Sequence, residues 1–158
     1  MMLVAIDPSV HPVIAVRKDD GKILFWTEKR GATALPKTLR ELGNPFRVYL
    51  EQPNYYFKGD SIQSALTFAE SAGVLKGMII ALGWGDRTIL VPPVKWMGFI
   101  DPAYQHPTGR AAYNARKKFF DDKAESLFPG VLPRKVKRSE GDALCILHYA
   151  IEKERKKS

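Results

Sequence analysis

Two short segments, LVAID at residues 3–7 and FRVYLE at residues 46–51, decide how this chain of 158 residues folds. Each is an apolar run that suits a buried β-strand and ends on a carboxylate, Asp7 or Glu51. A proline–serine pair after Asp7 favours a turn. In open α/β sheets, ligands bind at the carboxyl ends of the strands. The two carboxylates are therefore the first candidates for a functional site.

The rest of the chain alternates between strand and helix patterns. We expect strands at Met2–Ile6, Val13–Val16, Ile23–Thr27, Phe46–Leu50 and Ile89–Val91. We expect helices at Ala34–Leu42, Ser61–Leu82, Ala111–Leu127 and Asp142–Lys157, with residues 101–110 as a loop. Short turns join the first three strands, which predicts an antiparallel meander. The later alternation predicts an α/β fold whose sheet is at least partly parallel.

Length and composition restrict the class of protein. The chain fits one domain over residues 1–158, with a frayed basic tail at the end, and 45% of its residues are apolar. A single cysteine, Cys145, excludes a disulfide framework and a multi-cysteine zinc site. No apolar run reaches the roughly 18 residues of a membrane span. The opening lacks the basic start of a signal peptide, so we expect a cytoplasmic protein, or one in the host cytoplasm if viral.

The positive charge is concentrated in the C-terminal third. The net charge is +8, of which residues 1–109 carry +2 and residues 110–158 carry +6. A basic region of this kind favours a polyanionic partner, most often nucleic acid, because binding releases counterions from the phosphates. The alternative is that these lysines and arginines only keep the protein soluble.

The topology predicts that Asp7 and Glu51 lie close together. A right-handed crossover places the fourth strand parallel to the first and beside it, about 4.8 Å away. Two carboxylates at that spacing cannot both stay ionised unless a cation neutralises them, and oxygen ligands select Mg²⁺ or Mn²⁺. Taken singly, Asp7 is also an ordinary turn residue, and Glu51 can simply be solvated.

A third carboxylate, Asp142, precedes the apolar run ALCIL at residues 143–147. The sequence SEGD at residues 139–142 fits a capping box. In this motif Ser139 would cap the helix, and the Asp142 side chain would accept a hydrogen bond from the backbone N–H of Ser139. A helix that starts at the sheet edge can equally bring Asp142 beside the other two carboxylates. Glu140 is then either a fourth oxygen ligand or a solvated acid at the helix start.

These residues resemble a known family. AIDPS at residues 5–9, YLEQP at residues 49–53 and GDALCIL at residues 141–147 are similar to segments of the RuvC-like Holliday junction resolvases, which belong to the RNase H-like superfamily. The resemblance runs from Leu3 to about Ile151. It implies a mixed five-stranded sheet in which strands 1–3 form the meander, strands 4 and 5 run parallel to strand 1, and helices cover both faces.

The resemblance also implies a function. It predicts a crossover junction endodeoxyribonuclease of DNA recombination and repair, a homodimer that makes paired nicks in four-way junctions with two Mg²⁺ per site, for which Mn²⁺ can substitute. Asp7, Glu51 and Asp142 would bind the metal. The family's fourth acidic residue lies three positions from the last aspartate, where this chain has Ser139 and Cys145. Glu140 or a water molecule would take its place.

Several further residues are candidates for DNA contacts. Aromatic and basic residues follow Glu51 and precede Asp142, where they can stack on bases or bind phosphates. They are Tyr55, Tyr56, Lys58, Arg110, Arg116, Lys117, Lys118, Arg134, Lys135, Lys137 and Arg138. Alternatively, the aromatic residues form a hydrophobic plug, and the basic residues form a solvated loop. Gly73 and Gly77 indicate either close packing on the sheet or a dimer face. We read His148 as a residue at the surface or core edge.

Two other functions use the same features. One is an RNase H-like nuclease that acts on RNA–DNA hybrids or flaps, which would need the same carboxylates. The other is a catalytically silent nucleic-acid-binding module of the same fold. An actin-like ATPase is disfavoured because the sequence lacks glycine-rich phosphate loops.

Overall fold

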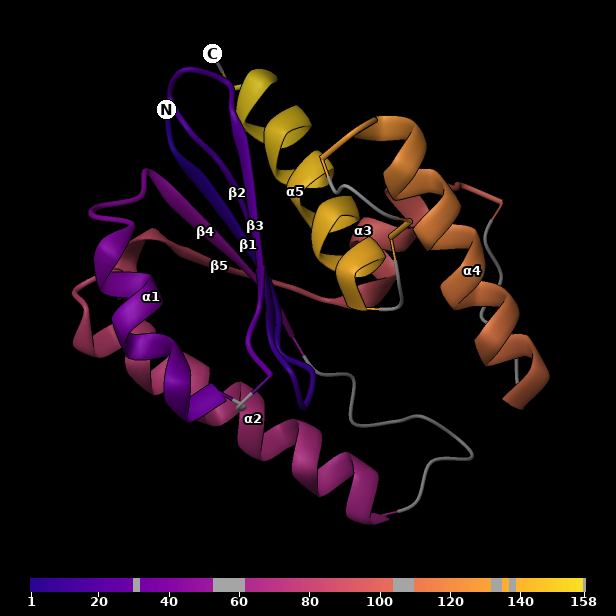
Figure 1. The fold of residues 1–158 in the computed structure, drawn as a ribbon, viewed down its shortest axis with the longest axis horizontal. Helices are drawn as coiled ribbons and strands as arrows, with labels where there is room; N and C mark the ends of the chain where they lie inside the picture. Colours follow the sequence, from indigo (N-terminus) through magenta and orange to yellow (C-terminus); the bar gives the residue numbers. More distant parts are fainter. Residues whose placement is uncertain (30–31, 53–61, 104–109, 132–134, 137–138, 158) are drawn as a thin grey trace.

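A computed structural model shows one sheet between two groups of helices (Figure 1). The structure describes residues 1–29, 32–52, 62–103, 110–131, 135–136 and 139–157. Within these ranges, no helix is both long and apolar enough to cross a membrane.

The sheet has five strands in the order β3-β2-β1-β4-β5. They are β1 (Leu3–Asp7), β2 (Val13–Arg17), β3 (Ile23–Thr27), β4 (Arg47–Glu51) and β5 (Thr88–Val91). The first three strands pair antiparallel, whereas β4 runs parallel to β1 and β5 runs parallel to β4. The predicted mixed sheet, with strands one and four adjacent, is confirmed.

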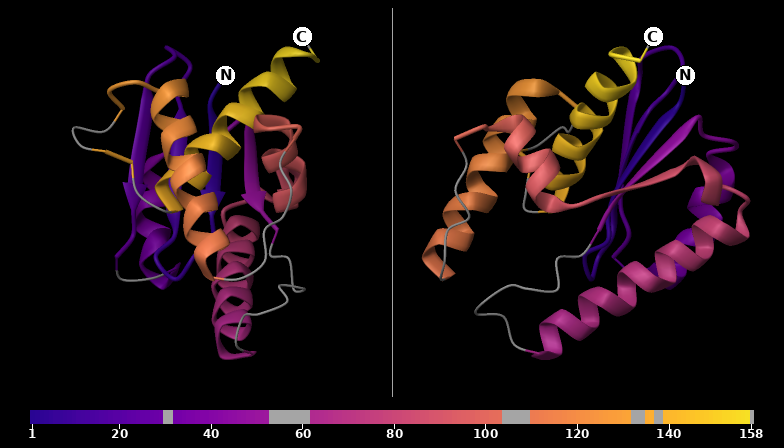
Figure 2. Two further views of the ribbon diagram at one scale, coloured as in Figure 1. Left: turned by 90° about the vertical axis from the view of Figure 1, so that its right-hand side faces the viewer. Right: turned by 180° about the vertical axis from the view of Figure 1, so that it is seen from behind.

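Helices cover both faces of this sheet. They are α1 (Leu35–Glu41), α2 (Ile62–Ala81), α3 (Pro93–Ile100), α4 (Arg110–Leu127) and α5 (Ser139–Arg155), with short 3₁₀ turns η1 (Ala32–Ala34) and η2 (Gly85–Arg87). One group, α1 and α2, lies on one face, while α3 and α5 lie on the other with α4 packed against α5 (Figures 1 and 2).

The alternation of side chains along β1 divides the core in two. Leu3 and Ala5 point to the face covered by α5, and Val4 and Ile6 point to the face covered by α1 and α2. All four side chains are fully buried, as expected for a central strand between two helical layers. By the same period of two, Asp7 belongs to the face covered by α5.

Helix α5 is fixed to the sheet along its whole length. It begins at the edge where β1 and β4 end, and it runs back across the sheet (Figure 1). Near its far end, the buried Tyr49 hydroxyl donates to Glu154 Oε1 at 2.6 Å, and Lys157 Nζ lies 2.8 Å from the same oxygen. The first turn of α5 is therefore held next to the carboxylates of the strands.

The differences from the sequence prediction that bear on the site concern α3, the ends of two strands and the start of α5. Helix α3 was not expected; Pro92 occupies its N-cap position and Pro93 is its first residue. Strands β1 and β4 each reach one residue further, so that Asp7 and Glu51 are their last residues. Helix α5 begins at Ser139 rather than Asp142.

Helices α4 and α5 approach each other closely at Gly141. A Cβ atom on this glycine would lie 2.3 Å from Asp121 Oδ1 and 2.9 Å from Asp121 Cα. One turn further, the Cys145 thiol lies 3.6 Å from the carbonyl oxygen of Phe120. The backbones of the two helices therefore meet where neither a larger side chain nor a shift of α4 is possible without rearrangement.

This contact predicts that Gly141→Ala destabilises the protein by about 1–3 kcal/mol, although alanine favours helices. The matched control is Gly98→Ala in α3, where a Cβ atom would meet nothing within 4 Å. It should leave stability unchanged or raise it by up to about 1 kcal/mol. Urea denaturation measures both changes, and equal effects of the two substitutions would contradict the close approach.

Candidate functional site

Three buried carboxylates gather where β1, β4 and α5 meet. Asp7 and Glu51 end neighbouring parallel strands, whose last registered pair is Ile6 and Leu50. Asp142 lies in the first turn of α5. The exposed fractions are only 2% for Asp7, 6% for Glu51 and 3% for Asp142. The predicted proximity of Asp7 and Glu51 follows from this register. The charge of Asp142 raises the pKa of both strand carboxylates, and the charge of Asp7 also raises the pKa of Glu51.

Asp7 is the carboxylate closest to the turn after β1. The backbone N–H of Ser9 donates to Asp7 Oδ1 at 3.0 Å. Burial and the charge of Asp142 raise the pKa of Asp7 from its ordinary 3.8 to about 7, although Lys117 and hydrogen bonds from Ser9 and Ser139 act in the opposite direction. Without a further cation, this group is thus partly protonated near neutral pH.

Glu51 is held by a tryptophan from helix α3. The indole Nε1–H of Trp96 donates to Glu51 Oε1 at 3.0 Å, and Trp96 is itself fully buried. Its ring contacts Phe120 edge-on, with centroids 4.9 Å apart. Burial, followed by the charges of Asp7 and Asp142, raises the pKa of Glu51 well above its ordinary value. The sequence analysis missed Trp96 because it missed the helix that carries it.

Asp142 forms an ion pair with Lys117 of helix α4. Lys117 Nζ donates to Asp142 Oδ2, and the side chains are only 13% and 5% exposed. Burial alone would lower the pKa of the lysine, but Asp142 and Asp7 outweigh it and raise the pKa. The other oxygen, Asp142 Oδ1, is buried and accepts no hydrogen bond. The side chain of Asp142 therefore contacts helix α4 instead of capping its own helix.

Ser139 and Glu140 take positions that differ from the capping-box interpretation. Ser139 is the first residue inside α5 rather than its cap, and its side chain hydrogen-bonds with Asp7. Glu140 is buried, and its Oε1 accepts a hydrogen bond of 3.4 Å from Thr27 at the end of β3. Thr27 ends β3, which lies two strands away from β1 in the sheet.

The donor set is suited to a hard divalent cation. It consists of carboxylate oxygens, the ligands that Mg²⁺ and Mn²⁺ prefer, and one of them, Asp142 Oδ1, is buried without a partner. In the arrangement described, no three His, Cys, Asp or Glu side chains among the described residues are placed to hold an ion together. Lys117 is the cation that lies among these carboxylates.

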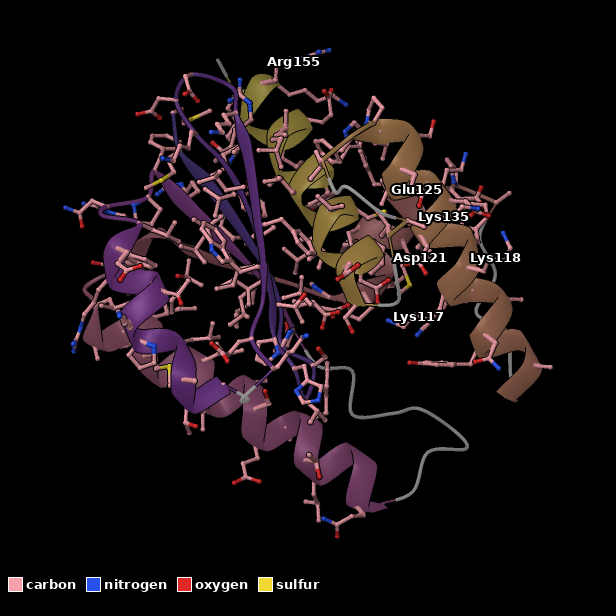
Figure 3. The ribbon with its side chains drawn as sticks, viewed as in Figure 1. Lys117, Lys118, Asp121, Glu125, Lys135 and Arg155 are labelled. Atoms are coloured by element: carbon pink, nitrogen blue, oxygen red, sulfur yellow. The ribbon has the colours of Figure 1, made fainter. Side chains whose placement is uncertain are left out.

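The predicted DNA-binding residues divide into two sets. Tyr55, Tyr56, Lys58, Arg134, Lys137 and Arg138 lie outside the described residues, as does the side chain of Arg110. Lys118 and Lys135 are exposed, and Lys118 pairs with Asp122 at 2.6 Å (Figure 3). Lys117, a candidate for phosphate contacts, is only 13% exposed and forms an ion pair with Asp142.

Tyr113 and His148 both take part in contacts with aromatic rings. Tyr113, which was not singled out from the sequence, is 49% exposed on α4, and the guanidinium of Arg116 lies 4.8 Å from its ring centre. His148 is half-buried between Phe99 and Phe128, with ring centres 5.9 and 6.3 Å away. It therefore lies at the core edge, as the sequence indicated.

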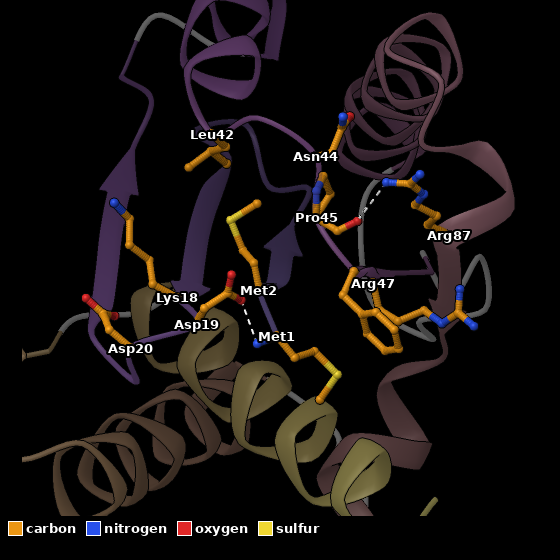
Figure 4. Close-up of a pocket in the computed structure, with 11 residues that line it drawn as sticks. Met1, Met2, Lys18, Asp19, Asp20, Leu42, Asn44, Pro45, Arg47 and Arg87 are labelled. Atoms are coloured by element: carbon orange, nitrogen blue, oxygen red, sulfur yellow. Dashed lines mark hydrogen bonds and ion pairs between the residues drawn. The ribbon is translucent and has the colours of Figure 1, made fainter. Parts of the chain in front are cut away.

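A cavity of about 900 Å³ lies at the opposite edge of the sheet, where β1 and β4 begin (Figure 4). Arg47 and Arg87 line it together with Asp19 and Asp20. Arg87 Nη1 donates to the Pro45 carbonyl at 3.2 Å, and the amino group of Met1 lies 2.6 Å from Asp19. The cavity thus carries charges of both signs that are partly paired. The three carboxylates lie at the other edge of the sheet.

Comparison with known proteins shows a likeness of fold. No protein-family model matches the sequence, and neither does any curated protein. Among solved structures, Thermus thermophilus RuvC is similar at 15% identity with a TM-score of 0.59, covering 96% of both chains. T. thermophilus RuvC in complex with Holliday junction substrate gives 15% identity, a TM-score of 0.61 and 96% of both chains.

The yeast mitochondrial Holliday junction resolvase Ydc2 is 17% identical, with a TM-score of 0.44 over 91% of this chain and 75% of that one. The likeness shows that this chain has a mixed α/β fold like that of T. thermophilus RuvC, as the sequence predicted.

The raised pKa of Asp7 predicts how stability depends on pH in the metal-free protein. Between pH 3.8 and about 7, folded Asp7 keeps a proton that the unfolded chain releases. The free energy of unfolding therefore falls as pH rises, by up to about 1.4 kcal/mol per pH unit from this one group. In chelator, wild type should lose more stability over this range than Asp7→Asn.

Urea denaturation across the pH range measures this difference. The exposed Asp86→Asn serves as the control and should follow wild type. If the free energy of unfolding changes with pH in the same way for Asp7→Asn and wild type, ionisation of Asp7 does not destabilise the folded protein.

Proposed function

We propose that this chain is a divalent-metal-dependent endonuclease that cleaves branched DNA, and that its substrate is the four-way junction. The observation that carries the proposal is the buried cluster of Asp7, Glu51 and Asp142 at the carboxyl edge of an RNase H-like sheet. Burying three carboxylates together is costly unless cations neutralise them. An arrangement with that cost is typical of a functional site rather than of a structural one.

Each residue of the cluster has a distinct task. Asp7, Glu51 and Asp142 would hold two Mg²⁺, of which one would supply a water of lowered pKa and the other would stabilise charge on the leaving oxygen of the phosphodiester. The Ser9 N–H and the Trp96 N–H orient Asp7 and Glu51. No protein nucleophile is needed, because water attacks the phosphorus and the P–O bond to the leaving strand breaks.

The basic C-terminal region offsets the acidity of this site. Three carboxylates would repel the phosphates of DNA, whereas residues 110–158 carry a net charge of +6. On the described surface of α4, Arg116 lies over the exposed ring of Tyr113, and this pair offers a cation and an aromatic face near Lys117. Such groups bind phosphates and unpaired bases without reading the sequence.

The junction is favoured over hybrids and flaps by the fold comparison. The similar T. thermophilus RuvC was solved in complex with Holliday junction substrate. This chain matches that protein over 96% of both lengths. We therefore place four-way DNA first among the substrates of the proposed nuclease.

We also propose that the chain acts as a homodimer through helix α2. Leu66, Gly73, Gly77 and Ile80 share one exposed face of α2, and Leu66 and Ile80 are 58% and 59% exposed. A Cβ atom on either glycine would meet nothing within 4 Å, so the glycines do not pack on the sheet. A second copy of α2 can approach the two glycines of this face closely, and a two-fold axis would present two sites to one symmetric junction.

A cleavage assay on four DNA or hybrid substrates tests the activity. Four-way junction, flap, duplex and RNA–DNA hybrid should be compared with Mg²⁺ and with chelator. We expect paired nicks in the junction only with Mg²⁺, and a loss of at least about a hundredfold in Asp7→Asn. Cleavage of the hybrid alone would instead indicate an RNase H activity, and no Mg²⁺-dependent cleavage would indicate a silent binding module.

Binding of the same junction separates catalysis from recognition. Asp7→Asn should bind the junction as well as wild type or more tightly, because the substitution removes a negative charge near the phosphates. Electrophoretic mobility shifts in chelator measure the affinity. Weaker binding by this variant would contradict the assignment of Asp7 to the metal rather than to DNA.

The dimer face predicts the effect of Gly77→Leu. The new side chain enters open space in the single chain, so the monomer should fold normally, while a close helix–helix contact would be blocked. Sedimentation velocity should show dimers for wild type and monomers for Gly77→Leu. Glu41→Leu, on α1, is the control and should stay dimeric; a dimeric Gly77→Leu would exclude this face.

A further inference from the structure

The turn that follows Asp7 is held by a hydrogen bond from the helical layer on the other side of the sheet. This turn, residues 8–12, joins the end of β1 to the start of β2 at Val13. Helix α2 passes beside it (Figure 1), and the Ser71 hydroxyl of α2 donates to the backbone carbonyl of Ser9 at 3.0 Å. This contact has no part in the proposed mechanism, although it reaches the residue that hydrogen-bonds with Asp7.

The N–H, the hydroxyl and the carbonyl of Ser9 each form a hydrogen bond. The N–H donates to Asp7 Oδ1 at 3.0 Å, the hydroxyl donates to the His11 carbonyl at 2.8 Å, and the carbonyl accepts from Ser71. The N–H and the carbonyl of one residue belong to adjacent rigid peptide planes, so a fixed carbonyl restricts the direction of the N–H. The Ser71 hydroxyl therefore helps to aim the N–H that orients Asp7.

Prolines at both ends of the turn increase the need for support from outside it. Pro8 and Pro12 are buried and have no N–H group, so neither can donate a hydrogen bond that closes the turn on itself. The end next to β2 is held by the Glu28 N–H, which donates to the Pro12 carbonyl at 2.9 Å. The end next to β1 is held to α2 through Ser71.

Core packing fixes the place of Ser71 relative to the sheet. Leu75, one turn after Ser71, and Ile79 are 0% and 1% exposed and belong to the same buried core as Ile6 of β1. Ser71 itself is half-buried, whereas the glycines of the proposed dimer face are exposed on the outer side of α2. A substitution of Ser71 thus leaves both the core residues of α2 and the proposed dimer face unchanged.

We infer that Ser71 is a positioning residue for the metal site, because it holds Ser9 and thereby keeps Asp7 in the orientation that binds the ion. The inference rests on the proposed function and extends it, since it gives a role in the site to α2, which carries none of the three carboxylates. Without the Ser71 hydroxyl, the turn and Asp7 would have to be ordered when the ion binds. That ordering costs conformational entropy and lowers the affinity for the ion.

The affinity for Mn²⁺ tests this inference without DNA. Electron paramagnetic resonance reports free Mn²⁺ during titrations of wild type, Ser71→Ala and Ser71→Thr. Loss of a partner that orients a metal ligand typically weakens metal binding by about 10–100-fold, and Ser71 lies one hydrogen bond further out. We therefore expect Ser71→Ala to raise the dissociation constant by at least about threefold. Ser71→Thr keeps the hydroxyl and should bind Mn²⁺ like wild type.

Thr67→Ala in the same helix is the matched control. The Thr67 hydroxyl donates to the Gln63 carbonyl at 2.9 Å, so its loss removes a hydrogen bond within α2 and none to the turn. This variant should bind Mn²⁺ like wild type. An equal loss of affinity in Thr67→Ala and Ser71→Ala would show a general effect on the helix and overturn the inference.

Urea denaturation in chelator tests the same link without metal. Ser71→Ala should destabilise wild type more than it destabilises Asp7→Ala, in which the Ser9 N–H has already lost its acceptor. If Ser71→Ala has the same effect in both backgrounds, Ser71 does not act through Ser9 on Asp7, and the inference is overturned.

The two measurements separate this inference from the proposed function. Unchanged Mn²⁺ affinity in Ser71→Ala overturns the inference and leaves the proposed nuclease intact. If wild type binds no Mn²⁺, the proposed metal dependence fails instead, and the denaturation experiment alone decides whether Ser71 positions Asp7. If Ser71→Ala does not fold, as judged by circular dichroism, Ser71→Cys takes its place in both experiments, because a thiol is a much weaker donor than a hydroxyl.

Discussion

The repulsion among three carboxylates buried at one sheet edge is the constraint on which the rest of this structure depends. Asp7 and Glu51 are side by side because β1 and β4 pair in parallel, and Asp142 joins them because α5 begins at the same edge. In the folded chain this repulsion is relieved by Lys117 and by the raised pKa of Asp7 and Glu51. The repulsion thus lowers the stability of the folded chain at a place where a bound cation can restore it.

The helical layer on this face of the sheet can be understood as the support of that cluster. Helix α3 brings the Trp96 N–H to Glu51, and α4 brings Lys117 to Asp142. The contact between Phe120 and Trp96 joins the two helices, so the donors to the carboxylates are held by one continuous packing arrangement. Helices α1 and α2 on the other face carry no part of the cluster, which leaves the outer side of α2 available for the proposed dimer.

The distribution of charge separates the two ends of the sheet. The carboxyl edge holds the acidic cluster and the basic helix α4 beside it, whereas the cavity at the amino edge has mixed and partly paired charges. Part of the positive charge of residues 110–158 therefore lies beside the cluster, on α4, whereas Lys153 and Arg155 lie at the far end of α5.

The sequence by itself determined the sheet and the two strand-end carboxylates, because apolar runs, turn residues and crossover handedness are properties of short segments. It identified Asp142 only as one of two possibilities, a cap or a site residue. The ion pair of Asp142 with Lys117, which lies 25 residues away in sequence, is a contact that neither possibility predicted. The direction of Glu140 toward Thr27 and the donor role of Trp96 were likewise decided by tertiary structure. The physical reason is that a side chain's partner depends on which helices pack together, and local patterns do not encode that packing.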